Sequence, residues 1–353
     1  MRADRSIRVG LRCDVDVTAG AGHLIRCIAL AEELVLRGAD VVFLSDLSGV
    51  SWVRRQLSSR SLPIAAPNRS ADDLARQAVE LGLNAVVIDG YRFDEATGRS
   101  LRRAGVTVLN VLDGEFGRQE ADLYLDQNLG AEHSLTVPAG AVGLAGVRFA
   151  LLRDVVRHER RPTPARRRHG DVLEVLAFFG GTDAFGAAPV VVPLLLRTGA
   201  RMRVRVVAPR PEIAGELRGL TTSSRQQLQI LAPVDDLPRL AESSDLVTCA
   251  SSSSTWELLC IGTTAAVVAV ADNQEPAYRA LLNEEVAFGI GRLDELRTDA
   301  VARDNAVRDL ATLLHDDERR AVMSARGWAL VDGHGRERVA DALLDRIVRA
   351  DPS

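Results

Sequence analysis

Short apolar runs alternate with amphipathic stretches along the first half of the chain. The apolar runs lie at residues 7–12, 40–44, 84–89 and 106–112, are rich in β-branched residues, and are separated by stretches with helical periodicity. Strands that are apolar along their whole length are typical of a parallel sheet covered by helices on both faces. The first half is therefore predicted to be a doubly wound α/β domain.

A basic segment interrupts this alternation at residues 153–170. Its sequence, RDVVRHERRPTPARRRHG, is dense in arginine and contains two prolines. We interpret it as a solvated linker, although a basic run of this kind could also bind phosphate groups. The alternation then resumes with the apolar run 172–179 and four further runs, so the second half is predicted to be another α/β domain.

These patterns predict a domain organisation. We expect a Rossmann-like domain at 1–152, a linker at 153–170, a second Rossmann-like domain at 171–330 and a C-terminal segment at 331–353. Two joined α/β domains imply a cleft between them, and ligands of parallel sheets bind at the carboxyl ends of the strands. The segments that directly follow the predicted strands are therefore the candidate sites.

The basic residues exclude several catalytic mechanisms and kinds of partner. All 44 of them are arginine, and lysine is absent from the sequence. Schiff-base and pyridoxal-phosphate catalysis need a lysine amine, and the P-loop needs a lysine on the nucleotide phosphates, so these mechanisms are excluded. The formal net charge of −4 also argues against a nucleic-acid partner.

Other features of the composition concern location and metals. No apolar run reaches the roughly 18 residues of a membrane span, and the N-terminal residues lack the apolar core of a secretory signal. We therefore expect a cytoplasmic protein without a membrane span. The four cysteines form no CxxC pair, which fits a reduced compartment, and the histidines show no metal-binding spacing. We expect neither a bound metal nor a cofactor.

The segment AGAGHLIRCIALAEEL follows the first predicted strand. Gly20 and Gly22 permit a tight turn, and the helix start behind them offers unpaired N–H groups to an anion. His23 lies at this positive helix end, which disfavours the imidazolium, so a neutral imidazole could accept a proton near pH 7. The alternative is that His23 merely caps the helix.

Two segments of the second half could bind phosphate. In FFGGTDAFG, Gly181 and the hydroxyl of Thr182 could surround a phosphate while Asp183 caps the following segment; a plain turn is the alternative. In CASSSSTWELLCIG, hydroxyl groups and N–H groups meet at a helix start where a diphosphate is favoured, and Glu257 could accept hydrogen bonds from a ribose. An ordinary N-cap run is the alternative there.

A further polar segment, ADNQEPAYRA, follows the apolar run AAVVAVA. The amides of Asn273 and Gln274 at this strand end could reach a sugar or phosphate oxygen, although loops are often polar without binding anything. In CASSSSTWELLCIG, the hydroxyl groups that could bind the diphosphate belong to Ser252, Ser253, Ser254 and Thr255.

Taken together and in this order, the motifs resemble a known family. The matching segments are RCD and GAGHLIRCIALA from Arg12, VVIDGY ending at Tyr91, ADLYLDQN at 121–128, RFALLR at 148–153, GGTD from Gly180, TWELLCIG from Thr255, ADNQ from Ala271 and DGHGRERV at 332–339. Over nearly its whole length the chain resembles the nucleotide-sugar hydrolases of pseudaminic acid biosynthesis, often labelled spore-coat polysaccharide proteins. That family is related to the GT-B glycosyltransferase that forms lipid II.

The resemblance implies a GT-B fold of two Rossmann-like domains, with the C-terminal helix returning to the first one. It implies that UDP is held in the second domain by Gly181, by the loop 252–255 and by Glu257. His23 would be the catalytic base, Tyr91 would line the sugar site, and Asp14 or Asp16 would orient the imidazole.

Three departures from the family pattern put the substrate in doubt. Serines stand at 252–254 where a glycine is usual, Thr263 and Thr264 follow Gly262 where a glycine–proline pair is usual, and Asp113–Gly114 replaces a frequent acidic pair. We therefore expect glycosyl transfer from a UDP-sugar to a small acceptor such as a nucleobase. Hydrolysis, with water as the acceptor, is the close alternative, and a non-catalytic nucleotide-sugar-binding subunit is the third.

Overall fold

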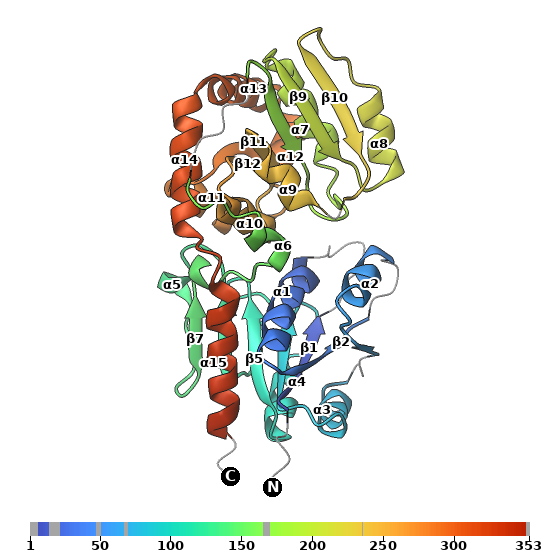
Figure 1. The fold of residues 1–353 in the computed structure, drawn as a ribbon, viewed down its shortest axis with the longest axis vertical. Coiled ribbons are helices and arrows are strands. Elements are labelled where there is room, and N and C mark those ends of the chain that lie inside the picture. Colours follow the sequence, from blue (N-terminus) through green and yellow to red (C-terminus); the bar gives the residue numbers. More distant parts are fainter. Residues whose placement is uncertain are drawn as a thin grey trace. The chain divides into compact units, whose positions relative to one another are not determined.

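The structure is a computed structural model that describes residues 6–13, 22–46, 51–66, 70–164, 170–234 and 236–350, without the side chains of 51–53. The chain divides into two compact units (Figure 1). Unit 1 combines Met1–Asp154 with His334–Ser353, and unit 2 is Val155–Gly333. Unit 1 is therefore built from two segments that are far apart in the sequence.

Unit 1 contains a seven-stranded sheet in the order β3-β2-β1-β4-β5-β6-β7, and all its pairings are parallel. The strands are β1 (Arg8–Cys13), β2 (Asp40–Leu44), β3 (Ile64–Ala65), β4 (Ala85–Asp89), β5 (Thr107–Leu112), β6 (Leu123–Asp126) and β7 (Val142–Ala145). The helices are α1 (Gly22–Leu36), α2 (Ser51–Ser58), α3 (Ala71–Glu80), α4 (Ala96–Arg103), α5 (Ala131–Ser134), the 3₁₀ turn η1 (Val147–Phe149) and α15 (Gly335–Ala350).

Both faces of this sheet are buried, which explains why its strands are continuously apolar. Alternate residues of a strand point to opposite faces. Val87 accordingly belongs to a core shared with α1 and α15, while Ile88 belongs to a second core shared with α3 and α4. The doubly wound α/β arrangement predicted for the first half is thus confirmed.

Helix α15 completes the first of these cores. Val339, Ala340 and Leu343 are buried in the same cluster as Leu24 and Ile28 of α1. At the start of α15, the close approach to the backbone of Ala150 leaves no room for a Cβ at Gly335. The shape of this contact explains the need for glycine there.

An ion-pair cluster accompanies this contact. Arg336 is 1% exposed, and its Nη1 donates to Glu32 Oε2 at 2.9 Å while its Nη2 donates to Asp154 Oδ1 at 2.5 Å. The Nε atom of Arg336 lies 3.2 Å from Glu33 Oε2. The charge buried with α15 is therefore compensated by three carboxylates of unit 1.

Unit 2 contains a six-stranded parallel sheet in the order β10-β9-β8-β11-β12-β13. Its strands are β8 (Leu173–Ala177), β9 (Met202–Val207), β10 (Gln226–Leu231), β11 (Leu246–Ala250), β12 (Ala265–Ala269) and β13 (Phe288–Arg292). Its helices are α6 (Asp154–His158), which begins on the last residue of unit 1, α7 (Ala188–Arg197), α8 (Pro211–Arg218), α9 (Leu237–Glu242), α10 (Ser253–Ile261), α11 (Glu275–Asn283), α12 (Leu293–Thr298), α13 (Ala300–His315), α14 (Asp317–Leu330) and the 3₁₀ turn η2 (Asp272–Gln274).

The first part of the expected linker is attached to unit 2. Arg160 Nη1 donates to the carbonyls of Cys260 and Val331, both at 2.7 Å, and its guanidinium lies 4.2 Å from the centre of the Trp328 ring. Arg161 Nη2 donates to the carbonyl of Glu242 at 2.6 Å. These arginines satisfy carbonyl groups of unit 2, so the described part of 153–170 is not simply a solvated connector.

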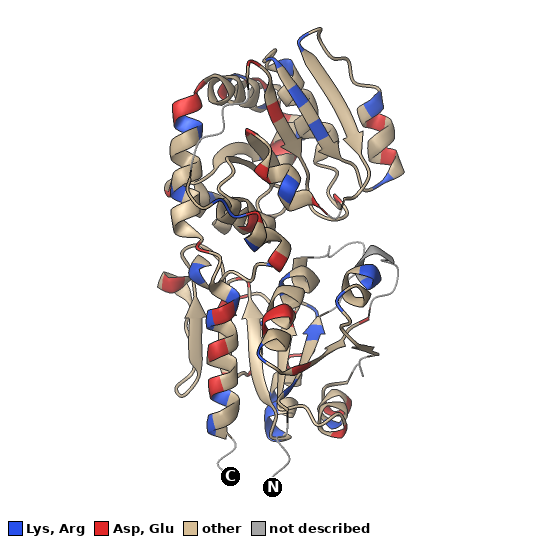
Figure 2. Cartoon of the chain, viewed as in Figure 1, with Lys and Arg blue, Asp and Glu red and all other residues tan. Residues whose placement is uncertain are grey.

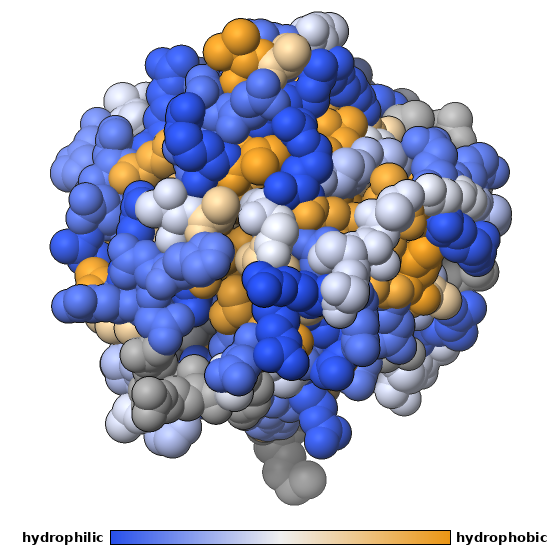
Figure 3. All heavy atoms as spheres, turned by 90° about the horizontal axis from the view of Figure 1, so that it is seen from above, coloured by the Kyte–Doolittle hydropathy of each residue, from blue (hydrophilic) through white to orange (hydrophobic). Residues whose placement is uncertain are grey.

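The surface carries both signs of charge. Figure 2 shows basic and acidic residues interspersed along helices such as α14 and α15. On the face drawn in Figure 3, hydrophobic residues form small groups separated by hydrophilic ones. Within the described part of the chain, no helix combines the length and apolar character needed to cross a membrane.

Candidate active site

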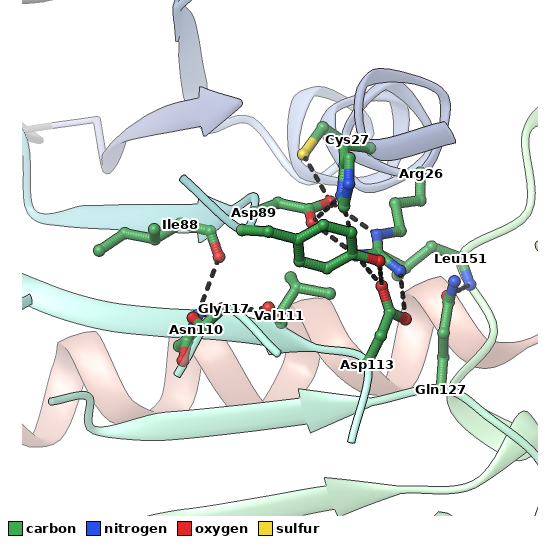
Figure 4. A network of polar contacts seen from close by, with 12 residues as sticks. Arg26, Cys27, Ile88, Asp89, Asn110, Val111, Asp113, Gly117, Gln127 and Leu151 are labelled. Carbon is green, nitrogen blue, oxygen red and sulfur yellow. Dashed lines mark hydrogen bonds and ion pairs between the residues drawn. The ribbon is translucent and has the colours of Figure 1, made fainter. Parts of the chain in front are cut away.

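The candidate site of unit 1 lies where β4 and β5 end and α1 begins. Strands β1, β4 and β5 are neighbours in a parallel sheet, so their carboxyl ends share one edge. Strand β4 ends at Asp89, Asp113 directly follows β5, and α1 brings His23 on its first turn and Arg26 at the start of its second. Figure 4 shows Arg26 and Cys27 of α1 facing Asp89, with Asp113 on the other side of Arg26.

His23 is bonded to a buried carboxylate. Its Nδ1 lies 2.7 Å from Asp89 Oδ1, and Asp89 is completely buried. Burial opposes the ionisation of Asp89, but the charge of Arg26 and the hydrogen bonds from Arg26 and His23 outweigh it and hold the pKa of this carboxyl well below its usual range. Arg26 Nη2 also lies 3.1 Å from this Nδ1, but the contact with the ionised carboxylate is shorter. Because an ionised carboxylate can only accept hydrogen bonds, we assign the proton to Nδ1 and the lone pair of the neutral ring to Nε2.

Arg26 joins two carboxylates. Its Nε and Nη2 donate to the two oxygens of Asp89 at 2.7 and 2.6 Å, and its Nη1 donates to Asp113 Oδ1 at 3.0 Å. Burial lowers the pKa of Arg26, but the charges of Asp113 and Asp89 raise it by a larger amount. The pKa of Arg26 therefore lies well above its ordinary value. The planar fork of arginine suits this bidentate geometry, which a lysine could not reproduce.

Both oxygens of the second carboxylate, Asp113, also accept hydrogen bonds. Arg26 Nη2 donates to its Oδ2 at 3.1 Å, the hydroxyl of Tyr91 donates to the same oxygen, and Asn128 Nδ2 donates to Oδ1 at 3.1 Å. Arg26 lowers the pKa of Asp113 against the effect of burial. Burial, reinforced by the charge of Asp113, raises the pKa of Tyr91 well above its ordinary value, so Tyr91 remains a hydrogen-bond donor.

Among the described residues of this cluster, these contacts leave Nε2 of His23 as the group that can accept a proton. Both oxygens of Asp89 and both oxygens of Asp113 already accept hydrogen bonds. No described residue donates to Nε2 of His23, whose side chain is 10% exposed. A histidine held through Nδ1 by a buried carboxylate, with Nε2 available, has the arrangement of a general base.

The predicted residues of this unit are placed as follows. Gly22 is the first residue of α1, and the ring of Tyr91 meets the His23 ring edge-on at 4.7 Å between centroids. Asp14, Asp16 and Gly20 lie outside the described residues.

Sequence reasoning missed Asp89 and Asp113 as functional residues; it gave Arg26, like Arg12 and Arg92, only as a possible partner of an anionic sugar, and did not pair it with these carboxylates. The available signals were a carboxylate that ends an otherwise apolar run, NAVVID, and an arginine three residues after His23 on the same helix face. Neither signal alone tells which carboxylate the histidine contacts.

In unit 2, three predicted segments follow neighbouring strands. Strands β8, β11 and β12 are adjacent, and the GGTD segment, the serine loop and the ADNQ segment follow them in that order. From β8 the chain passes to β9 and β10 on one side of the sheet, and it then returns to β11, β12 and β13 on the other side. Ligands of doubly wound sheets bind at such a switch point, which here lies between β8 and β11. The structure therefore brings these segments to one edge of the sheet. Among the described residues, no group of three or more His, Cys, Asp or Glu side chains could hold a metal ion.

The GGTD segment is a structured turn. Asp183 is 2% exposed, and its carboxylate accepts from the backbone N–H of Ala187 at 2.8 Å and of Ala188 at 3.1 Å. Asp183 thus satisfies N–H groups at the start of α7, although the N-cap residue of this helix is Ala187. Gly181 is exposed and Thr182 is half-buried, so both can be reached from solvent.

The serine loop opens helix α10. Ser252 is its N-cap residue, and its side chain makes no capping hydrogen bond. Ser253 and Ser254 are partly exposed in the first turn, whereas Thr255 is fully buried with its hydroxyl 3.5 Å from the carbonyl oxygen of Ala250. The reachable hydroxyls are therefore those of the three serines. Glu257 is partly buried one turn further on.

The two amides of the ADNQ segment differ. Asn273 is exposed, whereas Gln274 is partly buried and its Oε1 accepts from the backbone N–H of Val270 at 3.2 Å. Gln274 therefore stabilises the turn after β12, while the Asn273 side chain faces solvent.

The sheets and helices of the two units together define the GT-B fold of glycosyltransferases. MurG of Acinetobacter baumannii matches with a TM-score of 0.71 and 16% sequence identity, covering 96% of this chain and 99% of that protein. S. aureus MnaA, solved with UDP, matches with a TM-score of 0.64 and 13% identity over 98% of each chain. At these identities the similarity establishes the fold, and the GT-B expectation is confirmed.

Similar sequences are distant. The chain is 26% identical to the UDP-N-acetylglucosamine–N-acetylmuramyl-(pentapeptide) pyrophosphoryl-undecaprenol N-acetylglucosamine transferase of Acidiphilium cryptum, covering 92% of this chain and 94% of that protein. It is 19% identical to an uncharacterized protein of Methanocaldococcus jannaschii over 77% of this chain but only 57% of that longer protein. No protein-family model matches the chain.

Proposed function

We propose that the protein is an enzyme that transfers a glycosyl group from a UDP-sugar to a small acceptor. The His23–Asp89 pair carries this proposal, because its geometry provides a general base with a defined tautomer. The distant relative named as an N-acetylglucosamine transferase and the UDP bound to a protein of the same fold support the choice of donor.

In the proposed reaction, Nε2 of His23 accepts the proton of the acceptor while its oxygen or nitrogen attacks the anomeric carbon. The new bond forms as the bond between the anomeric carbon and the diphosphate oxygen breaks, and UDP leaves with the bonding electrons. Asp89 remains ionised and stabilises the imidazolium that forms, as a buried carboxylate does in other His–Asp pairs.

The donor would be held by unit 2. N–H groups at the start of α10 and the hydroxyls of Ser252–Ser254 suit a diphosphate, whose negative charge the helix start favours. Gly181 and Thr182 would contribute to the same site, and Glu257 and Asn273 would bind hydroxyl groups of the nucleotide or sugar. Gln274 would position this loop.

Hydrolysis is the second candidate, because His23 could equally deprotonate water. The resemblance to nucleotide-sugar hydrolases favours it, and the serines at 252–254, which depart from that family, favour transfer. A nucleotide-sugar-binding subunit without catalysis remains the third candidate, and the hydrogen bond that holds His23 through Nδ1 argues against it.

The deciding experiment is UDP release by the purified protein from a panel of UDP-sugars, with and without small acceptors. UDP release that requires an acceptor supports transfer, and rapid release without one identifies a hydrolase. Tight UDP binding without release from any donor supports the binding subunit.

The variant His23→Ala is expected to lower turnover by about 10²- to 10⁴-fold, the usual contribution of a general base. UDP affinity, measured by calorimetry, should stay near that of the wild type. His133→Ala, which removes an exposed histidine of the same unit, is the matched control and should retain activity. Retention of most activity in His23→Ala would contradict its role as the base.

A further inference from the structure

Two aromatic side chains near the candidate base, Tyr91 and Phe116, are exposed, and Tyr91 is the one that contacts His23. Tyr91 is 42% exposed and Phe116 is 54% exposed. Their ring centroids lie 6.0 Å apart with an interplanar angle of 59°, and Tyr91 in turn contacts the ring of His23. Single exposed apolar residues are common on protein surfaces. Here Tyr91 contacts the candidate base and Phe116 contacts Tyr91.

The position of Phe116 is fixed by its turn. Its backbone N–H donates to the carbonyl of Asp113 at 3.3 Å, and the N–H of Gly114 donates to Asp126 Oδ2 at 2.9 Å. At the other end, Asn110 Nδ2 donates to the carbonyl of Gly117 at 3.1 Å. The ring of Phe116 is therefore presented by a hydrogen-bonded turn.

Glycine is required where this turn passes the end of β4. Gly117 has φ of 76°, and a Cβ at this position would lie 2.8 Å from the carbonyl oxygen of Gly90. The close approach brings the turn next to the residue that precedes Tyr91. The two aromatic rings are thus placed together by the backbone.

The polar groups around these rings are already paired. Asp89 and Asp113 have their oxygens occupied, and the hydroxyl of Tyr91 is donated to Asp113. An acceptor molecule bound against Tyr91 and Phe116 therefore meets ring surfaces beside the ring of His23. This combination favours a flat ring that stacks and carries an acidic N–H or O–H.

We propose that Phe116, together with Tyr91, binds the acceptor and selects a small planar heteroaromatic ring of the nucleobase type. This proposal rests on the proposed function of the site. A ring N–H would lose its proton to His23 Nε2, the nitrogen would bond to the anomeric carbon, and UDP would leave with the electrons of the broken C–O bond. The proton passes from His23 to solvent, which restores the neutral base. Phe116 is a specificity-determining residue, since its ring takes no part in the bond changes.

The test compares acceptors in the full-length protein. Transfer from the best UDP-sugar is measured with cytosine and uracil as planar acceptors and with glucosamine as a non-planar amine. Phe116→Ala is expected to raise the KM for the planar acceptors by about 5- to 100-fold, the range found when an aromatic partner of a stacked base is removed. The KM for the donor and the KM for glucosamine should change less than twofold.

Two further variants complete the design. Phe116→Trp keeps a stacking surface and should restore the KM for planar acceptors. Val79→Ala, at another position of unit 1 that is 54% exposed, is the control and should behave as the wild type. Equal KM values for planar acceptors in Phe116→Ala and the wild type would overturn the proposal. So would a selective loss of glucosamine transfer.

A separate measurement distinguishes this proposal from the proposed function. Binding of cytosine to wild type and to Phe116→Ala is measured by saturation-transfer NMR, which needs no turnover. Binding that Phe116→Ala weakens, in a protein that releases no UDP from any donor, would support the ring site and reject the proposed activity. Donor turnover with no cytosine or uracil binding or transfer would reject the ring site alone.

Discussion

The candidate sites of unit 1 and unit 2 consist of different kinds of chemical groups. The site of unit 1 consists of buried charged side chains, and the oxygens of Asp89 and Asp113 are occupied by Arg26 and its neighbours. The candidate donor site of unit 2 consists of a helix start and partly exposed serine hydroxyls. A proton-transfer group needs a fixed tautomer, which buried charges provide, whereas a diphosphate can be held by backbone N–H groups.

The comparison predicts that substitutions in unit 1 affect catalysis and folding strongly, while single substitutions in the serine loop mainly affect donor affinity. A buried charge network tolerates the loss of a member poorly because the remaining charges stay unpaired. A helix start keeps its backbone donors when one hydroxyl is removed.

The largest effect is expected for Asp89→Asn. An amide at this position can donate to Nδ1 of His23, which moves the lone pair away from Nε2. The kcat should fall on the order of 10³- to 10⁴-fold, as expected when a base is held in the wrong tautomer. UDP release kinetics measure this, and UDP affinity should be retained. Asp304→Asn, in the exposed pair with Arg197, is the control. A fall in kcat below tenfold would argue against the role of Asp89.

Arg26→Met should reduce the stability of unit 1. The substitution leaves Asp89 and Asp113 buried without their cation, and breaking such a network costs about 3–5 kcal/mol in the free energy of unfolding. Urea denaturation followed by circular dichroism measures the change. Arg99→Met breaks an ion pair with Glu120 whose side chains are 50% and 47% exposed, and it should cost no more than about 1 kcal/mol. Similar losses in both variants would show that the network of unit 1 adds no stability.

The pH dependence of stability should differ between wild type and Arg26→Met. Because Arg26 lowers the folded-state pKa of Asp89 and Asp113, their contribution is present above their unfolded pKa, about 4, and is lost as the pH falls through the folded values. Without Arg26, burial raises the pKa values of Asp89 and Asp113 in the folded state. The pH dependence of the free energy of unfolding then has the opposite sign, so the variant becomes more stable as the pH falls. The stability difference between the two proteins should therefore shrink when urea melts are repeated at pH 7, 5 and 4. A constant difference would contradict this electrostatic account.

The smallest effect is expected in the serine loop. Ser254→Ala removes one hydroxyl next to the proposed diphosphate, and a single hydrogen bond of this kind contributes about 0.5–1.5 kcal/mol. The KM for the donor should rise by about two- to tenfold at nearly constant kcat, while the unfolding midpoint stays the same. A loss of kcat as large as that of Asp89→Asn would show that the serines take part in the chemistry.

The sequence predicted the fold well because continuous apolar strands leave few alternatives. The runs around Val87 and Val247 have to be covered on both faces, and this requirement already implies two parallel α/β sheets. The order of motifs after the strands likewise indicated which segments meet at one edge of each sheet.

The pairing of side chains could not be predicted in the same way. In the sequence, Asp14, Asp16, Asp89 and Asp113 all stand at or shortly after predicted strands, and the register of β1, β4 and β5 brings Asp89 to His23. The same holds for Thr255 and Gln274, which the sequence presents as polar loop residues. Their hydrogen bonds to Ala250 and Val270 depend on turn geometry that periodicity does not encode.

The return of α15 to unit 1 has a consequence for synthesis on the ribosome. Val339 and Leu343 fill the core around α1, and they are translated only after all of unit 2. Unit 2 is continuous and can complete its core first, whereas the α1 face of unit 1 stays uncovered until the last helix emerges. The core of unit 1 can therefore be completed only after unit 2 has been synthesised, in contrast to the usual N-terminal-first order of domain folding. The nascent first unit is the part that would need protection by chaperones.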